Sequence, residues 1–311
     1  MKILITGIAG FIGSHVAEYL QNAGHTIIGI DNFSDYYPVD LKNKNAAVLK
    51  SKGIEILRAD LRAVSSIEKL PEDVQYIFHF AAQPGIAATS TFEDYLTNNV
   101  IATQNLLTYA LALKDLQLFV NIGTSSIYGL NATYPETVAP QPASHYGVTK
   151  LAAEQLALCN SRLNKLNACS LRLYSVYGSR ERPDKLFTKL LDCGLHNKSF
   201  PLFTGSLTHL RSFTHVSDIV EGITSVIGKE DVCNGEIFNI GTEAEYTTQQ
   251  GVDAVEKLLN TTIKFNELPP RSGDQQRTKA NIDKARKLLN YNPTVTLEEG
   301  VAEQLEWFRK L

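Results

Sequence analysis

The stretch KILITGIAGFIG at residues 2–13 decides the fold of this chain. Its first part, KILIT, is a short apolar run of the kind found in parallel strands that are buried on both faces. Glycines follow at positions 7, 10 and 13, and residues 12–23 then have the pattern of a helix. A strand, a glycine-rich turn and a helix in this order predict the first unit of a doubly wound α/β sheet.

Outward from this unit, short apolar runs alternate with longer amphipathic stretches. Strands are expected at Lys2–Thr6, Thr26–Ile30, Ile54–Leu57, Tyr76–Phe80, Leu118–Ile122, Ser170–Tyr174 and Glu236–Ile240. Helices are expected at Ile12–Ala23, Thr91–Leu113 and Ala143–Asn160, with another after Ser217. The alternation predicts an α/β fold, a doubly wound parallel sheet of Rossmann type with about seven strands.

The pattern becomes less regular from Tyr177 onward. Residues 179–183 are polar and arginine-rich, residues 200–210 look like a loop, and residues 268–277 carry two prolines and two arginines before a final helical region. We therefore expect a Rossmann domain formed by residues 1–176 with 212–240. A smaller C-terminal α/β domain that holds the substrate would be formed by residues 177–211 with 241–311.

The composition is that of an ordinary soluble protein, with 43% hydrophobic and 20% charged residues in 311. A net charge of −3 argues against a broad nucleic-acid or membrane surface, although a small arginine cluster could serve one anionic ligand. The four cysteines lack the spacing of a metal or redox site. No apolar run approaches the roughly 18 residues that cross a bilayer. We expect a cytoplasmic protein with no metal and no nucleic-acid or membrane partner.

The glycine-rich turn is suited to a dinucleotide. Glycine at positions 7, 10 and 13 permits a tight turn, close approach of the backbone to a pyrophosphate, and close packing of helix on sheet. The helix N-terminus also offers N–H groups to the phosphates. The second strand ends at Asp31, whose carboxylate can accept hydrogen bonds from the adenosine ribose hydroxyls. Because this carboxylate would repel a 2′-phosphate, we expect NAD rather than NADP.

The ends of the next two strands extend this prediction. Asp60 and Leu61 follow the third strand, where they would meet the adenine, although Asp60 could instead cap the next helix. Residues 79–83 (HFAAQ) follow the fourth strand, where small side chains would let the nicotinamide half lie against the backbone. We expect His79 itself to be a packed strand residue.

Tyr146 and Lys150 lie four residues apart in a predicted helix, so the phenol and the ammonium can point into the same space. The cation would lower the pKa of the tyrosine from about 10 toward neutrality and make Tyr146 a base for a hydroxyl group. Chance alone predicts about one such pair in a chain of this composition, so a solvated helix face is the alternative. The preceding run NIGTSSIYG, at residues 121–129, supplies the context that favours a site.

An ordered series of motifs resembles the extended short-chain dehydrogenases/reductases, and more narrowly the nucleotide-sugar 4-epimerases. In chain order the motifs are GIAGFIG, IDNFSDYY, Asp60-Leu61, HFAAQ, NNVIATQNLL, TSSIYG, YGVTK, LRLYSVYG, RSFTHVSD, RSGD and KARKLLNYNP. Within this family the resemblance is closest to the UDP-glucuronate 4-epimerases. This closer resemblance depends on two stretches, DNFSDYYPVDLK at residues 31–42 and RERPD at residues 180–184.

The resemblance implies a reaction and the residues that perform it. A UDP-sugar would pass hydride from C4 to NAD⁺ and regain it on the opposite face after a transient 4-keto stage, with UDP-glucuronate to UDP-galacturonate as the best assignment. Thr124, Tyr146 and Lys150 would be catalytic. NAD would be held by Gly7, Gly10, Phe11, Ile12, Gly13, Asp31, Asn32, Phe33, Asp60, Leu61, Ala81, Ala82, Gln83, Asn99, Tyr146, Lys150, Tyr174 and Val176. The UDP-sugar would be held by Gln83, Ser125, Ser126, Ser175, Arg182, Leu202, Phe203, Arg211, Arg271 and Asp274.

Several alternatives stay open on the same scaffold. The glucuronate epimerases usually carry arginine where this chain has Ala87, which favours a UDP-glucose or UDP-xylose 4-epimerase. The related 4,6-dehydratases carry Asp-Glu where Ser125 and Ser126 stand, and the related UDP-glucuronate decarboxylases carry glutamate at Ser126, so both activities are disfavoured. A non-catalytic NAD-binding regulator is the remaining alternative, because fold alone does not fix function.

Two further expectations concern the carboxylate and the assembly. The 4-keto form of a glucuronate is a β-keto acid that loses CO₂ readily, so an epimerase must restrain the carboxylate, and Arg182 and Ser175 are the candidates. Members of the family commonly pair through helices that correspond to residues 91–113 and 143–160. We therefore expect a homodimer with a four-helix interface.

Overall fold

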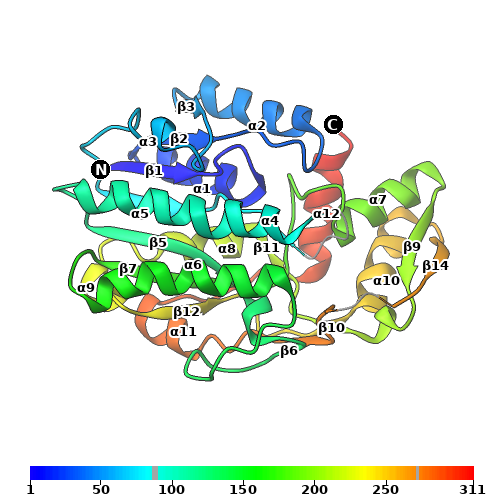
Figure 1. Ribbon diagram of the computed structural model, residues 1–311. Coiled ribbons are helices and arrows are strands. Elements are labelled where there is room, and N and C mark those ends of the chain that lie inside the picture. Colours follow the sequence, from blue (N-terminus) through cyan, green and yellow to red (C-terminus); the bar gives the residue numbers. More distant parts are fainter. Residues whose placement is uncertain (86–89, 271–272) are drawn as a thin grey trace.

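The computed structural model describes residues 1–85, 90–270 and 273–311. Its main feature is a parallel sheet of seven strands in the order β12-β7-β5-β4-β1-β2-β3 (Figure 1). The strands are β1 (Lys2–Thr6), β2 (Thr26–Asp31), β3 (Glu55–Arg58), β4 (Tyr76–His79), β5 (Leu118–Thr124), β7 (Ala168–Leu173) and β12 (Ile237–Ile240). All seven expected strands are confirmed. The strand order reverses between β1 and β4, which is where ligands bind in sheets of this type.

Helices cover both faces of the sheet. Successive residues of a strand point to opposite faces, and apolar residues at successive positions make both faces apolar. Ile3 and Ile5 of β1 belong to the apolar cluster that includes α1 (Phe11–Asn22) and α8 (Val216–Thr224), whereas Leu4 belongs to the cluster that includes α5 (Ala102–Ala112). Figure 1 shows α5 and α6 (His145–Arg162) side by side across one face. The other helices around the sheet are α2 (Val39–Ser51), α3 (Val64–Ile67), α9 (Glu230–Cys233) and α11 (Asp283–Leu289). The doubly wound architecture is thus confirmed.

The helix expected over residues 91–113 is not uniform. It consists of α4 (Phe92–Tyr95), a π-helical segment η1 (Leu96–Ile101) and α5. A π-helical turn carries one more residue than an α-helical turn and is often found at functional sites. The apolar periodicity of the sequence did not reveal this widened turn.

A smaller lobe follows β8 (Val176–Tyr177) and extends to one side of the sheet (Figure 1). Its elements are α7 (Leu186–His196), β9 (Ser199–Phe203), η3 (Ser206–Thr208), β10 (Leu210–Arg211), β13 (Tyr246–Thr247), α10 (Thr248–Leu259), β14 (Lys264–Leu268), β15 (Arg277–Thr278) and α12 (Leu297–Phe308). Two short strands, β6 (Asn131–Ala132) and β11 (Thr214–His215), pair with β15 and β8. The exact division into two domains stays a prediction.

The expectation of a loop over residues 200–210 is wrong for most of that stretch. Strand β9 pairs in parallel with β14, and η3 and β10 follow it. Phe200 and Leu202 alternate with Pro201 and point into the apolar core of the smaller lobe, which also contains Phe187 and Val255. Pro201 and the short length of this edge strand hide it in the sequence. None of the helices in the described ranges has the length and apolar character needed to span a membrane.

Helix α6 is fixed to the sheet by a buried ion pair. The Arg172 guanidinium on β7 donates two hydrogen bonds to Glu154 on α6, at 2.7 Å and 2.9 Å, and each side chain is only 1% exposed. Arg172 also donates to the Tyr128 hydroxyl at 2.6 Å, which donates in turn to Asn239 of β12 at 3.0 Å. One buried network therefore joins α6, β7, β12 and the turn η2 (Ser125–Tyr128) that follows β5.

Replacement of Arg172 by methionine is expected to lower the free energy of unfolding by about 3–5 kcal/mol, because it leaves the Glu154 carboxylate buried without its partner. Urea unfolding at neutral pH measures this loss. Arg286→Met is the control, because its ion pair with Glu243 lies at the surface with both side chains more than 40% exposed. Arg286→Met should lower the free energy of unfolding by less than about 1 kcal/mol. Equal losses in the two variants would contradict the anchoring role.

Candidate active site

A cleft of about 710 Å³ runs along the carboxyl ends of the sheet strands and into the smaller lobe. Most of the residues predicted from the sequence line it. They are Gly7, Gly10, Phe11, Ile12, Gly13, Asp31, Asn32, Asp60, Leu61, Ala81, Ala82, Gln83, Thr124, Ser125, Ser126, Tyr146, Lys150, Tyr174, Ser175, Val176, Arg182, Phe203, Arg211 and Asp274. Within the described ranges, no group of histidine, cysteine, aspartate and glutamate side chains is arranged to hold a metal.

The glycine-rich turn has no room for side chains. Gly7 has φ +67° in the left-handed region, and its amide donates to Ile30 O at 2.8 Å. A Cβ added to Gly13 would lie 2.5 Å from Gly7 O, and one added to Gly7 would lie 2.8 Å from Ala81 N. Helix α1 begins here, and Gly10 at its N-cap supplies no side chain to the first N–H groups. These N–H groups and the close turn fit a pyrophosphate.

Asp31 ends β2 at the edge of the cleft. Its carboxylate accepts hydrogen bonds from Ala9 N at 3.0 Å and Phe33 N at 2.8 Å. Burial raises the pKa of Asp31 despite these bonds. Lys42, which sequence analysis missed, also lines the cleft, and its Nζ donates to the carbonyl and hydroxyl of Ser34 at 2.7 Å and 2.9 Å. A charged pair thus stands where the adenosine ribose is expected.

Phe33 does not line the cleft, in contrast to its predicted role at the cofactor site. Its backbone is left-handed, with φ +52°, which turns the ring away. The ring is buried against Ala9 and Ala46, and the Arg58 guanidinium lies 4.4 Å from the ring centroid. Phe33 therefore contributes to this region through its backbone N–H, which holds Asp31.

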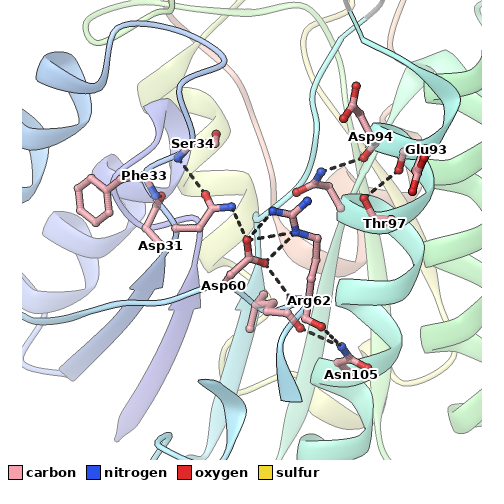
Figure 2. Close-up of polar contacts among 12 residues, drawn as sticks. Asp31, Phe33, Ser34, Asp60, Arg62, Glu93, Asp94, Thr97 and Asn105 are labelled. Carbon is pink, nitrogen blue, oxygen red and sulfur yellow. Dashed lines mark hydrogen bonds and ion pairs between the residues drawn. The ribbon is translucent and has the colours of Figure 1, made fainter. Parts of the chain in front are cut away.

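Asp60 is held by Arg62 (Figure 2). The Arg62 guanidinium donates to the carboxylate at 3.0 Å and 2.7 Å, and the Asn32 amide donates to it at 3.2 Å. Burial would raise the pKa of Asp60, but the hydrogen bonds from Arg62 outweigh this effect and lower the pKa to about 2. The N-cap of α3 is Ala63, so the alternative in which Asp60 caps that helix is excluded.

A buried chain of hydrogen bonds connects β1, β4 and the helix beside them. Thr103 Oγ1 donates to Asn99 O at 2.6 Å and must therefore accept its other bond from His79 Nε2 at 2.8 Å. With a lowered pKa of about 3, caused by burial, the His79 ring is neutral, so its Nδ1 accepts from Thr6 Oγ1 at 2.8 Å. Thr6 Oγ1 in turn accepts from Ala81 N. His79 is thus a packed strand residue with a fixed tautomer.

Asn99 holds the loop after β4 instead of lining the cleft. Its amide oxygen accepts from Gln83 N at 2.7 Å, and its amide nitrogen donates to Thr149 Oγ1 of α6 at 3.0 Å. The π-helical segment η1 places Asn99 in this buried position while the adjacent Asn98 lines the cleft. Asn99 therefore holds Gln83, and its contact with NAD stays a prediction.

Tyr146 lies in the first turn of α6, close to the end of β5. A Cβ on Gly147 would lie 2.8 Å from Ser126 O, so the glycine lets the helix approach the turn that carries Thr124 and Ser126. Thr124 hydrogen-bonds the Tyr146 phenol, and so does the backbone of Gly85. The structure thus brings Thr124 and Tyr146 together as predicted.

The expected lowering of the pKa of Tyr146 is wrong for this arrangement. Burial raises the pKa of the phenol, and the hydrogen bond from Thr124 and the charge of Arg182 only partly offset this effect. Lys150 is buried one turn further along α6, and burial lowers the pKa of its ammonium to about 8 although Glu154 acts to raise it. The sequence predicted the pair of Tyr146 and Lys150, but it did not show the free-energy cost of burying their charged forms.

The far end of the cleft belongs to the smaller lobe. The Arg182 guanidinium donates to Asp184 at 3.0 Å and 2.9 Å and lies 5.3 Å from the centroid of the Tyr36 ring. Arg211 contacts Asp274 at 3.4 Å. Leu202 does not line the cleft, because it is buried in the core of the smaller lobe. Arg271 and Ala87 lie outside the described residues.

Gln275 is a cleft residue that sequence analysis missed. Its side-chain amide donates to Ser125 O at 3.2 Å and to Gly129 O at 3.0 Å, and its oxygen contacts the Ser125 hydroxyl at 3.4 Å. It thereby ties the loop of Asp274 to the turn after β5. Tyr36, Tyr37 and Asp184 in loops and Lys42 on α2 also line the cleft and were missed, because no glycine or strand-end signal marks them.

A Rossmann sheet with a glycine-rich turn, an acidic residue at the end of β2 and a Tyr-Lys pair facing one cleft defines a nicotinamide-dependent enzyme. The sequence profile described as the NAD dependent epimerase/dehydratase family matches residues 3–241. The chain belongs to this family, and the predicted cofactor, NAD, is confirmed.

Three relatives are similar over nearly the whole chain. A Bacillus subtilis protein named "uncharacterized UDP-glucose epimerase YtcB" is 36% identical, over 100% of this chain and 99% of that protein. UDP-glucuronate 4-epimerase 3 of Arabidopsis thaliana is 32% identical, over 99% of this chain and 76% of that protein. The crystal structure of UDP-glucuronic acid 4-epimerase from Bacillus cereus, in complex with UDP-glucuronic acid and NAD, superposes with a TM-score of 0.94 at 34% identity. It covers 100% of this chain and 99% of the other.

The lowered pKa of Lys150 predicts a pH-dependent stability. The unfolded chain binds up to one more proton than the folded chain between pH 8 and 10.5, so burial of this group destabilises the folded state below pH 8, and the penalty is relieved as the pH rises through that window. Relative to Lys150→Met, the wild-type free energy of unfolding should rise by about 3 kcal/mol across it. Urea unfolding at the two pH values measures the change. Lys165→Met, at an exposed position just after α6, is the control and should show no such rise.

Proposed function

We propose that this protein inverts C4 of a UDP-sugar through a transient 4-keto intermediate and that it converts UDP-glucuronate to UDP-galacturonate. The observation that carries the proposal is the Tyr146 phenol, hydrogen-bonded by Thr124 at the sheet edge with Lys150 one helical turn away. The similarity to the Bacillus cereus and Arabidopsis thaliana enzymes supports the choice of substrate.

The residues present account for the chemistry. NAD supplies the hydride acceptor and donor when it is bound. The Tyr146 phenolate takes the proton from the sugar 4-hydroxyl and later returns it, while Thr124 hydrogen-bonds the same oxygen. The Lys150 ammonium favours the ionised phenol and binds the nicotinamide ribose. Gly7, Gly10 and Gly13 admit the pyrophosphate, and Arg211, Asp274 and Arg271 hold the nucleotide end of the substrate.

Ser125 and Ser126 favour epimerisation over the activities of the related dehydratases and decarboxylases. Both line the cleft beside Thr124, where they are positioned to hydrogen-bond the hexose. A hydroxyl group is a poor acid or base at neutral pH, so this pair does not support the elimination of water from a ketosugar. The complete set of Thr124, Tyr146 and Lys150 likewise disfavours a non-catalytic NAD-binding regulator. A UDP-glucose or UDP-xylose 4-epimerase is the second candidate, favoured by Ala87 and, for glucose, by the name of the Bacillus subtilis relative.

Arg182 supports a uronate substrate. Its guanidinium is only 13% exposed and lines the hexose end of the cleft, and two of its five N–H groups are engaged by Asp184. The remaining donors suit a carboxylate. These donors can hold the carboxylate of the 4-keto sugar so that its bond to the ring is not aligned with the π-system of the 4-keto group. Loss of CO₂ is then prevented. Ser175, which also lines the cleft, is the second candidate for this restraint.

We also propose a cytoplasmic homodimer. Phe92 and Ile101 on the α4–α5 stretch and Val148 on α6 each expose more than 40% of their surface. These helices are the ones predicted to pair, and an exposed apolar face on them supports a four-helix interface. Sedimentation of the purified protein as a monomer at micromolar concentration would exclude the dimer. The four free cysteines fit a reducing compartment.

The proposed activity is tested by NMR on purified protein without added cofactor. Incubation with UDP-glucuronate, UDP-glucose and UDP-xylose should give the C4 epimer of the first most rapidly, and denaturation should release NAD. Tyr146→Phe should retain NAD but lose about 10²–10⁴-fold in rate, because the base is gone. Tyr19→Phe, at an exposed position on α1, is the matched control. Protein without NAD that leaves every UDP-sugar unchanged would refute the proposal.

The carboxylate contact is tested with Arg182→Met at one pH for both substrates, because the ionisation of the free enzyme affects kcat/KM for both equally. The ratio of kcat/KM for UDP-glucuronate to kcat/KM for UDP-glucose should fall by about tenfold or more, the usual effect of losing a charge-assisted hydrogen bond. Released CO₂ should rise with UDP-glucuronate. Arg211→Met should lower kcat/KM for both substrates by the same factor, because it is assigned to the nucleotide. An unchanged ratio and unchanged CO₂ release in Arg182→Met would remove this role.

A further inference from the structure

Gly85 lies where three segments meet at the Tyr146 phenol. It follows β4 with φ +74°, and its backbone hydrogen-bonds the phenol. Tyr95, at the end of α4, donates to Gly85 O at 2.9 Å, and its ring centroid lies 6.2 Å from that of Tyr146. The phenol is therefore held by the same short loop that Tyr95 holds.

The Arg182 guanidinium packs against the same glycine. A Cβ added to Gly85 would lie 3.4 Å from Arg182 Nη2, which is ordinary van der Waals contact. The guanidinium also lies over the Tyr36 ring and is bound by Asp184, so its position is fixed from two further sides. Gly85 thus lies next to both the base of the proposed reaction and a buried cation.

This cation differs from Lys150 in a way that matters for an ionised phenol. Burial lowers the pKa of Lys150 to about 8, so its charge is partly lost at mildly alkaline pH. A guanidinium stays charged at every working pH. Among the charges that act on the phenol, that of Arg182 lowers its pKa most. The raised pKa of the buried phenol makes such a charge necessary.

We propose that Arg182 has a second role in the epimerase reaction, in which its fixed charge stabilises the ionised phenol of Tyr146. Toward Tyr146 it is a positioning residue, and this role rests on the proposed function. The two roles are coupled, because a substrate carboxylate bound to Arg182 screens the charge that the phenol feels. A neutral hexose leaves that charge in place. The proton-accepting strength of the base therefore depends on the substrate.

The other groups that face the phenol modulate this effect. Burial raises the pKa of the neighbouring Tyr36, Tyr95 acts to raise the pKa of the Tyr146 phenol, and Thr124 donates a hydrogen bond that favours the phenolate. Lys150 approaches from one turn along α6 and Asp184 through its pairing with Arg182. The Asp184 side chain is 45% exposed against 13% for Arg182, so solvent screens the anion more than the cation. The charge of Arg182 therefore acts on the phenol more strongly than that of Asp184.

The test measures the phenol directly, without turnover. Tyrosinate absorbance is titrated in the NAD-loaded wild type and in NAD-loaded Arg182 variants, and the titration of the same protein with Tyr146→Phe is subtracted. Arg182→Met should raise the midpoint by about one pH unit or more, because it removes the opposite charge that lowers the pKa of the phenol most. Arg182→Lys should restore most of the shift. Asp184→Asn should lower the midpoint.

Arg162→Met is the matched control, because it removes the same charge as Arg182→Met but from the end of α6, the helix that carries Tyr146. Arg162 lies sixteen residues beyond Tyr146, or about 24 Å along the helix, where salt screens its charge. The midpoint of the tyrosinate titration in Arg162→Met should equal that of the wild type. The acid limb of the pH–rate profile should also lie at higher pH for UDP-glucuronate than for UDP-glucose.

A midpoint in Arg182→Met that equals the wild-type midpoint would overturn the inference, and so would a shift no larger than that of Arg162→Met. A lowered rate with an unmoved midpoint would assign Arg182 to substrate binding alone. Because the titration needs no turnover, it reports on Arg182 even if no UDP-sugar is epimerised. Failure of the proposed function is therefore seen separately, in the NMR assay.

Discussion

The buried ion pair between Glu154 and Arg172 is the interaction on which the site depends. Tyr146, Lys150 and Glu154 lie at four-residue intervals on one face of α6, and only the last of them holds the helix to the sheet. Through Tyr128, the same arginine reaches the turn that follows Thr124. Base, ammonium and hydroxyl are therefore placed by one network instead of by three separate contacts.

Glu154 also has an electrostatic role. The Lys150 ammonium is taken out of water, which disfavours its charge, and the carboxylate one turn further on acts to keep it charged. The phenol suffers the same loss of hydration, and Thr124 and Arg182 act to keep it ionisable. Each charged or ionisable group thus works only because a neighbour offsets the cost of its burial. A rigid frame of uncharged groups, from Thr6 through His79 to Asn99, holds the loop that carries Gln83 and Gly85.

The sequence predicted those parts of the structure that depend on local pattern. Seven strands followed from apolar runs, the tight turn after β1 from three glycines, and the shared orientation of Tyr146 and Lys150 from a helical spacing. These signals survive without knowledge of tertiary contacts because each is confined to a few adjacent residues. The family resemblance extended them to Thr124, which the structure places beside Tyr146.

Most of the misses concern the direction of a side chain or a contact between distant segments. Phe33 turns away from the cleft through one left-handed residue, and Leu202 turns into the smaller core because it alternates with Pro201. The π-helical turn buries Asn99, and Gln275 reaches a turn about 150 positions earlier in the chain. The pairing of Arg172 with Glu154 and the direction of the pKa shift at Tyr146 both depend on burial, which is a property of the folded chain.

The central claim is that hydrogen leaves C4 and returns to it inside one cleft. The most direct measurement uses a UDP-sugar carrying deuterium at C4, turned over in ordinary water by the purified enzyme and analysed by mass spectrometry and NMR. The account predicts that the epimer keeps its deuterium at C4, because bound NAD takes up and returns the same atom. A product that carries solvent hydrogen at C4 would contradict it.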